Sequence, residues 1–196
     1  MAEPHSLWIK VTHWLHLLAL LLLVLTGFQI TYAGGFPVFP TMRLAREWHF
    51  YAMWLLLWTL VAKVYYLLAT GTWRDTAVSG RDLRDPPGLL RYYLFLTPEQ
   101  PPYEKYNAGQ KLLYSLFPWV LAFQALTGFI LYNPIHLEAL WLHPWLLNLN
   151  TIRLLHYLVA WFFVVTVAVH LYLVLAEGWQ ALREMTDFRR RPGGGH

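Results

Sequence analysis

The chain contains no cysteine among its 196 residues. Without thiolates it cannot form disulfides, thiolate zinc sites, iron-sulfur clusters or the C-x-x-C-H attachment that holds haem covalently. Any redox centre must therefore be held by other side chains. Charged residues are also scarce, at 13%, whereas 57% of the residues are hydrophobic. This balance is typical of membrane proteins.

The basic residues do not form the continuous stripe that indicates nucleic-acid binding. The net charge is +4, but Lys and Arg are scattered between hydrophobic blocks. We therefore expect no nucleic-acid partner and interpret these residues as topology determinants that also contact membrane lipid.

Four segments are long and apolar enough to cross about 30 Å of hydrocarbon. They cover about residues 11–32, 48–68, 112–132 and 151–176. We therefore expect an all-α fold, a single integral-membrane four-helix bundle over residues 1–196. The first run is longer than the hydrophobic part of a signal peptide, so we expect it to stay as a span.

The connections carry three further expectations. The segment PPGLLRYYLFLTPE, residues 86–99, is flanked by prolines and predicts a short interfacial helix in the inner loop. Residues 133–150 are rich in Trp and Leu but broken by proline, which predicts a cap on the opposite membrane surface. Residues 183–196 predict a basic, flexible tail.

The distribution of Lys and Arg predicts the orientation. Eleven lie on the side that collects both termini and the long loop, and three lie on the other side. Because cytoplasmic segments carry the excess of Lys and Arg, we expect both termini in the cytoplasm.

Five of the nine histidines fall inside the predicted spans, although ionisable residues are costly in hydrocarbon. They are His13, His16, His49, His156 and His170. His156 and His170 are fourteen residues apart, nearly four helical turns, so they share one helix face at a separation of about 21 Å. That distance is too long for one metal ion, whose nitrogen ligands lie about 2 Å away. Two sites stacked across the membrane fit better.

Depth in the membrane predicts the partners of these two histidines. The first span enters from the cytoplasm, which brings His13 to the level of His170. The second span returns from the outside, which brings His49 to the level of His156. Each pair supplies the two axial ligands of a b-type haem, whereas zinc and copper sites usually need three or four protein ligands. We therefore predict two haem b groups.

His16 leaves one ligand assignment open. It follows His13 by three residues on nearly the same helix face, and spacing alone does not choose between the two. For any single histidine, a hydrogen bond between helices is the ordinary reading. Four that sort into two pairs of equal depth favour haem.

Cations precede three of the predicted ligands by three residues, on the same helix face and one turn nearer to water. They are Lys10, Arg46 and Arg153. Haem propionates would lie there, although snorkelling side chains at the ends of spans are an ordinary alternative.

Gly27 follows His13 by fourteen residues and should lie at the depth of the outer histidine pair. Its missing side chain leaves room for a macrocycle, and helix packing is an equally ordinary role.

These residues resemble the bacterial four-helix di-haem cytochromes b, the membrane subunits of formate dehydrogenases and nickel-iron hydrogenases, related to the cytochrome b561 group. The resemblance rests on THWLH and LTG in the first span, His49 opening the second, YNAGQK before the third and H-x13-H in the fourth. It implies axial ligands on the first, second and fourth helices. These match His13, His49, His156 and His170.

The motif YNAGQK, residues 106–111, looks most like the formate dehydrogenase gamma subunit. That resemblance implies that Asn107, Gly109 and Gln110 bind quinone near His170. Taken alone, an Asn and a Gln at the head of a span indicate a helix cap at least as well.

The resemblance implies an electron conduit in the bacterial inner membrane and its respiratory chain. We expect electrons to pass between iron-sulfur and catalytic oxidoreductase subunits on the outer side and quinone, with the direction left open. The complex could also form homo-oligomers. Two alternatives stay open: a stand-alone superoxide:quinone oxidoreductase of the same group, and a haem-free transporter or proton relay that uses titrating histidines.

Overall fold

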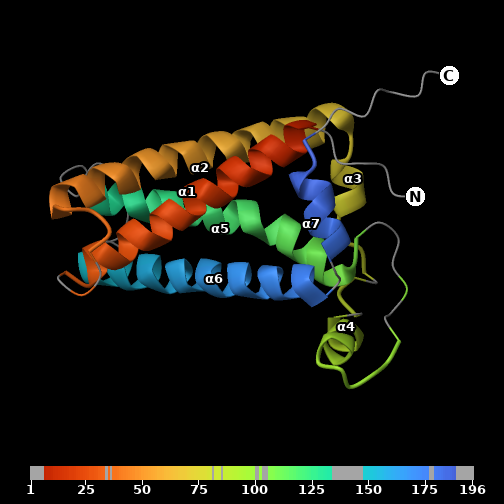
Figure 1. Cartoon of the computed structure of the whole chain (residues 1–196). Helices are drawn as coiled ribbons and strands as arrows, with labels where there is room; N and C mark the ends of the chain where they lie inside the picture. Colours follow the sequence, from red (N-terminus) through yellow and green to blue (C-terminus); the bar gives the residue numbers. More distant parts are fainter. Residues whose placement is uncertain are drawn as a thin grey trace. The chain divides into compact units, whose positions relative to one another are not determined.

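A computed structural model describes residues 7–33, 35, 37–80, 82–84, 86–99, 102, 106–133, 148–176 and 179–188. Over these residues all regular secondary structure is helical (Figure 1). The helices are α1 (Leu7–Thr31), α2 (Met42–Thr70), α3 (Trp73–Thr76), α4 (Pro86–Tyr93), α5 (Ala108–Tyr132), α6 (Leu149–Ala176) and α7 (Trp179–Thr186). Helices α1, α2, α5 and α6 are long and apolar enough to cross a membrane. The predicted all-α membrane class is confirmed, and the protein is an integral membrane protein.

Each membrane helix begins before the apolar run that predicts it, and at α2 a polar side chain caps the added first turn. Helix α2 begins six residues before Trp48. There the backbone N–H of Leu44 donates to Thr41 Oγ1 at 3.2 Å, and Arg43 pairs with Glu47 at 3.0 Å one turn later. The hydrophobic run therefore predicts which part of a helix crosses the hydrocarbon, and not where the helix begins.

The chain divides into two compact units. The first unit covers Met1–Lys63 and Pro134–His196, and within the described residues it holds α1, α2 as far as Lys63, α6 and α7. The second unit covers Val64–Asn133 and holds the end of α2, α3, α4 and α5.

Helices α1 and α2 of the first unit run antiparallel. His16 pairs with Thr59 and Thr26 pairs with His49, so residues further along α1 meet residues earlier in α2. The buried Gln29 holds the connection between the two helices, because its side-chain oxygen accepts from the backbone N–H groups of residues 38 and 39 at 3.1 and 2.8 Å.

The beginning of α1 is fastened to the end of α7. The Lys10 ammonium donates to the carbonyl of Asp187 at 2.7 Å, and the Trp14 indole donates to the carbonyl of Met185 at 2.9 Å. Arg183 to Thr186, where the predicted tail starts, form the last turn of α7. Residues 189–196 lie outside the described residues, as do residues 134–147 of the outer cap predicted at 133–150.

Candidate functional site

The structure brings together the histidines that membrane depth predicts as partners. The ring centroids of His13 and His170 are 6.2 Å apart, with an angle of 59° between the ring planes. Those of His49 and His156 are 6.4 Å apart, with an angle of 58°. All four residues lie in the first unit, so α6 faces α1 with one histidine and α2 with the other.

The separation within each pair fits two imidazoles on one metal ion. A metal-nitrogen bond of about 2 Å, and a further distance of about 1.2 Å to the ring centre, put the centroids of two opposed ligands about 6.4 Å apart. Both pairs meet this value. His170 is exposed and the other three histidines are half-buried. A group bound between the two rings of a pair could therefore reach them and cover their exposed surface.

The described residues hold no group of three or more His, Cys, Asp or Glu side chains that could bind a metal ion. Structural and catalytic zinc sites use three or four protein ligands. A porphyrin supplies four of the six iron ligands, so a pair of histidines is enough for haem. Over the part of the chain that the structure describes, the donor set therefore fits haem better than a bare metal ion.

Thr26 sets the tautomer of His49. Its hydroxyl donates to the carbonyl of Leu22 at 2.6 Å and lies 2.8 Å from His49 Nδ1. A hydroxyl carries one proton, so the oxygen must accept from Nδ1–H while it donates to the carbonyl. The lone pair of His49 is then on Nε2, the nitrogen that can bind a metal ion. Thr26 has no exposed surface, so this orientation is protected from water.

Gly27 lies directly against the same ring. A Cβ at this position would be 3.4 Å from His49 Cε1 and 3.9 Å from Nδ1. An added methyl would be in ordinary contact, but a longer side chain would press on the imidazole. The structure thus places Gly27 at the depth that the fourteen-residue spacing predicts.

His16 faces α2 and bonds to Thr59. It is buried, and its Nδ1 lies 2.8 Å from Thr59 Oγ1, which itself donates to the carbonyl of Leu56 at 2.8 Å. By the same one-proton argument, His16 Nδ1–H donates to Thr59. The other histidine of α1, His13, lies beside His170.

The three cations have different surroundings. Arg46 and Arg153 are exposed, and Arg153 Nη1 donates to Asn150 Oδ1 at 3.0 Å. Lys10 is buried, with its ammonium on the carbonyl of Asp187. Lys10 therefore also fastens α7, a role that its position in the sequence did not indicate.

In the second unit, Asn107 and Gln110 form a capping box at the start of α5. The Asn107 side-chain oxygen accepts from the Gln110 backbone N–H at 2.9 Å, and the Gln110 side-chain oxygen accepts from the Asn107 backbone N–H at 3.0 Å. The ordinary reading of this motif as a helix cap is confirmed. The two bonds of the cap use the side-chain oxygens of Asn107 and Gln110 and do not involve their NH2 groups.

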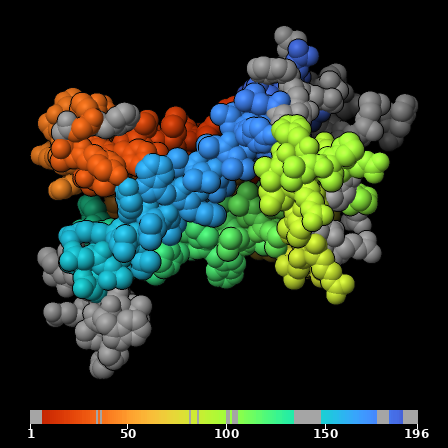
Figure 2. All heavy atoms as spheres, turned by 90° about the horizontal axis from the view of Figure 1, so that it is seen from below, coloured from red at the N-terminus to blue at the C-terminus, as the bar shows by residue number. Residues whose placement is uncertain are grey.

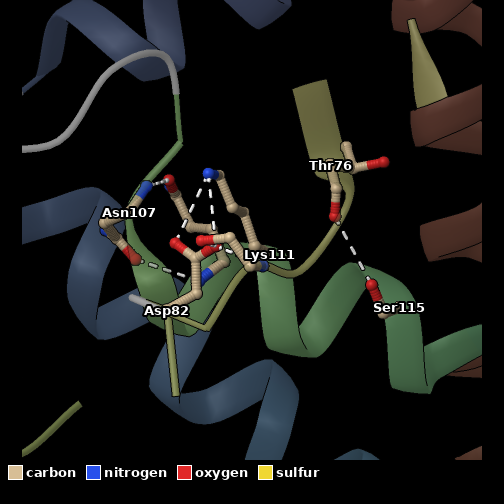
Figure 3. A network of polar contacts seen from close by, with 7 residues as sticks. Thr76, Asp82, Asn107, Lys111 and Ser115 are labelled. Atoms are coloured by element: carbon tan, nitrogen blue, oxygen red, sulfur yellow. Dashed lines mark hydrogen bonds and ion pairs between the residues drawn. The ribbon is translucent and has the colours of Figure 1, made fainter. Parts of the chain in front are cut away.

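Gly109 and Lys111 fasten the inner loop to α5. A Cβ at Gly109 would be 3.2 Å from Leu89 of α4, so a glycine permits this close approach. The Lys111 ammonium lies 3.4 Å from the buried Asp82 carboxylate (Figure 3). The hydroxyl of Ser79 at 2.6 Å, its backbone N–H at 2.7 Å, and Lys111 hold the pKa of Asp82 below its ordinary value.

Sequence reasoning missed Thr26 and Thr59. The available signal was a hydroxyl within an apolar run at the depth of a histidine on the neighbouring helix. It is a weak signal, because threonines in membrane helices commonly bond to their own preceding turn, as both of these also do.

The family model of prokaryotic cytochrome b561 matches residues 4–187. The chain is 28% identical over 189 residues to a probable Ni/Fe-hydrogenase B-type cytochrome subunit of Rhizobium leguminosarum bv. viciae, covering 86% of this chain and 78% of that protein. It is 25% identical over 193 residues to the corresponding subunit of Cupriavidus necator, covering 86% and 77%. A shorter match of 61 residues, 41% identical, covers 26% of this chain and 31% of a putative protein-methionine-sulfoxide reductase subunit, YedZ1, of Azospira oryzae. No solved structure matches the chain significantly.

Proposed function

The chain belongs to the prokaryotic cytochrome b561 family, and on this premise we propose that it is the di-haem membrane subunit of an oxidoreductase complex that exchanges electrons with quinone. The family implies haem b and electron transfer within the membrane. The number of haems, the quinone and the partner are the proposed parts.

The observation that carries the proposal is the presence of two histidine pairs, each at the separation that one iron requires. We propose that His13 and His170 hold one haem and that His49 and His156 hold the other. When bound, haem supplies the one-electron redox chemistry that the side chains of this chain lack. Helix α6 carries a ligand for both sites, about 21 Å apart, and so fixes the distance between them.

The surrounding residues of this chain prepare the sites. Thr26 holds His49 with its Nε2 lone pair available, and Gly27 leaves space beside that ring. Arg46, Arg153 and Lys10 stand one turn from three of the ligands and would pair with the propionates at the membrane boundary. The ammonium of Lys10 has three donors, so its bond to the Asp187 carbonyl leaves donors for this role.

We assign the quinone to the head of α5. The NH2 groups of Asn107 and Gln110 are the donors that a quinone carbonyl would accept from, and Gly109 lies between them in the first turn. This part of the proposal rests on the motif YNAGQK and on the resemblance that it carries.

The names of two relatives, probable Ni/Fe-hydrogenase B-type cytochrome subunits, favour a catalytic oxidoreductase partner. We propose that this partner includes an iron-sulfur subunit. Hydrogen is then the first candidate for the partner's substrate, and formate is the second. The Lys and Arg count supports a bacterial inner-membrane protein with both termini on the cytoplasmic side. We therefore propose that the partner binds on the opposite, outer side. We propose that electrons run from this partner to quinone.

Purification of the chain from its own membranes in mild detergent tests this function. We expect the catalytic and iron-sulfur subunits to co-purify, and the partner's substrate to reduce the cytochrome bands, which added quinone then reoxidises. A chain that purifies alone and is reduced by superoxide would be a stand-alone oxidase. A chain with no Soret band would be the haem-free alternative.

Two conservative variants separate the quinone role from the capping role. Asn107→Asp and Gln110→Glu keep the oxygens of the capping box and remove the amide donors. We expect the variants to fold and to retain both cytochrome bands, but to reoxidise more slowly with quinone. Unchanged reoxidation would leave these residues as a cap alone.

A further inference from the structure

Helix α4 ends in a turn that normally uses glycine. The backbone N–H of Leu96 donates to the carbonyl of Arg91 at 2.8 Å, and that of Phe95 donates to the carbonyl of Tyr92 at 2.9 Å. These two bonds define a Schellman motif, in which the residue at the Phe95 position adopts the left-handed conformation. Phe95 has φ of 58°, and among the described residues it is the one non-glycine residue with positive φ. A side chain costs free energy here, so some interaction must offset that cost.

The described part of the chain does not provide that interaction. Phe95 is 83% exposed, and the neighbouring Leu90, Leu94 and Leu96 are between 58% and 70% exposed. The yellow-green atoms of this segment are open to view in Figure 2. Four large apolar side chains are thus gathered at the end of one short helix without being buried.

The other face of α4 is fastened to α5. Leu89 is buried and lies next to Gly109, and Tyr93 Oη lies 3.5 Å from Asn107 Nδ2. These contacts join α4 to the first turn of a membrane-spanning helix. Helix α4 therefore lies at the level where α5 enters the membrane, with its apolar residues exposed on the side away from α5.

The charges beside this face suit a lipid surface. Arg84 and Arg91 are exposed, whereas the carboxylate of Asp82 is turned inward to Lys111. An amphipathic helix with basic flanks and large apolar side chains lies at the boundary between headgroups and acyl chains, and anionic lipids strengthen its binding.

We propose that Leu90, Leu94, Phe95 and Leu96 form a membrane anchor. It inserts into the acyl region of the leaflet at which α5 begins. Burial of the Phe95 ring in lipid offsets the cost of its backbone conformation. The anchor would hold the inner loop against the membrane surface, with Arg84 and Arg91 on anionic headgroups. This inference does not depend on haem binding.

Single-cysteine labelling tests the anchor, because the natural chain has no cysteine. Phe95→Cys and Leu94→Cys in the full chain are each spin-labelled in nanodiscs of neutral and anionic phospholipid. Collision rates with oxygen and with a water-soluble nickel chelate are then measured. Glu99→Cys, an exposed polar position in the same segment, is the aqueous control. Trp119→Cys, exposed on α5, is the lipid control.

We expect the oxygen-to-nickel collision ratio at positions 95 and 94 to be several-fold higher than at 99 and close to that at 119. Nanodiscs of neutral lipid alone should lower the ratio at 95 and 94. Nickel collisions at 95 and 94 equal to those at 99 would overturn the proposal. Protection from both oxygen and nickel at 95 and 94 would also overturn it, since that result indicates cover by protein and not by lipid.

Discussion

Substitution of Thr26 by Val tests how the protein prepares His49. Valine has nearly the shape of threonine but no hydroxyl, so His49 Nδ1 loses its hydrogen bond to Thr26 Oγ1, while the backbone of Leu23 remains a hydrogen-bond partner of the ring. The loss of one such hydrogen bond costs about 0.5–1.5 kcal/mol. Thr26 also donates to the Leu22 carbonyl, which belongs to the preceding turn of the same helix and keeps its helical bond. Most of the effect should therefore fall on the imidazole.

The expected sign follows from ligand basicity. A hydrogen bond from Nδ1–H to an acceptor makes the imidazole a stronger donor to iron and favours the oxidised state. If about half of the hydrogen-bond energy distinguishes the two redox states, its loss raises the midpoint potential by about 10–30 mV, because about 59 mV corresponds to a tenfold change, or about 1.4 kcal/mol, for one electron. Only the haem of His49 and His156 should respond.

Potentiometric titration of the alpha bands measures this shift, and Thr26→Ser should restore the natural value. Thr59→Val is the matched control, because it removes the same kind of hydroxyl from His16, to which we assign no haem. Equal shifts in Thr26→Val and Thr59→Val would refute the reasoning. A shift in Thr59→Val alone would mean that His16 is a ligand.

Two further predictions concern Gly27 and Asp82. Gly27→Ala should be tolerated, since its Cβ would be 3.4 Å from His49 Cε1, whereas Gly27→Leu should lose one haem, measured as a drop in Soret absorbance per chain; full haem content in the leucine variant would contradict the role of Gly27. The ionised Asp82 carboxylate, whose pKa Ser79 and Lys111 lower, stabilises the docked inner loop at neutral pH, and this contribution is lost as the pH falls through the lowered pKa. Hydrogen exchange in α4 should therefore accelerate in acid, and Asp82→Asn should be fast already at neutral pH; exchange that is insensitive to both changes would exclude the Lys111 pair as the fastening.

The sequence could predict which histidines meet, because helical rise and membrane thickness determine depth. His156 and His170 are near opposite ends of one span, so each can meet only a residue of equal depth. Depth does not determine how α1 is rotated about its axis. His13 and His16 differ by about 60° around that helix, and packing against α2 turns His16 toward Thr59. That choice depends on side-chain packing that spacing does not record.

The start of α5 shows a second limit. Asn107 and Gln110 fit a helix cap and a quinone site equally well by residue type, and the structure uses their oxygens in the cap. Gly109 permits contact with Leu89, which comes from a separate short helix. The sequence predicted that helix at residues 86–99, but not which residue of α5 it would contact.

The number of haems per chain tests the central claim most directly. It is measured by the pyridine haemochrome assay on purified protein of known concentration. We predict two haems in the natural chain, one in His156→Ala, one in His170→Ala, none in the double variant and two in His16→Ala. Two haems in either single α6 variant, or the loss of one in His16→Ala, would contradict the assignment of one haem to each histidine pair.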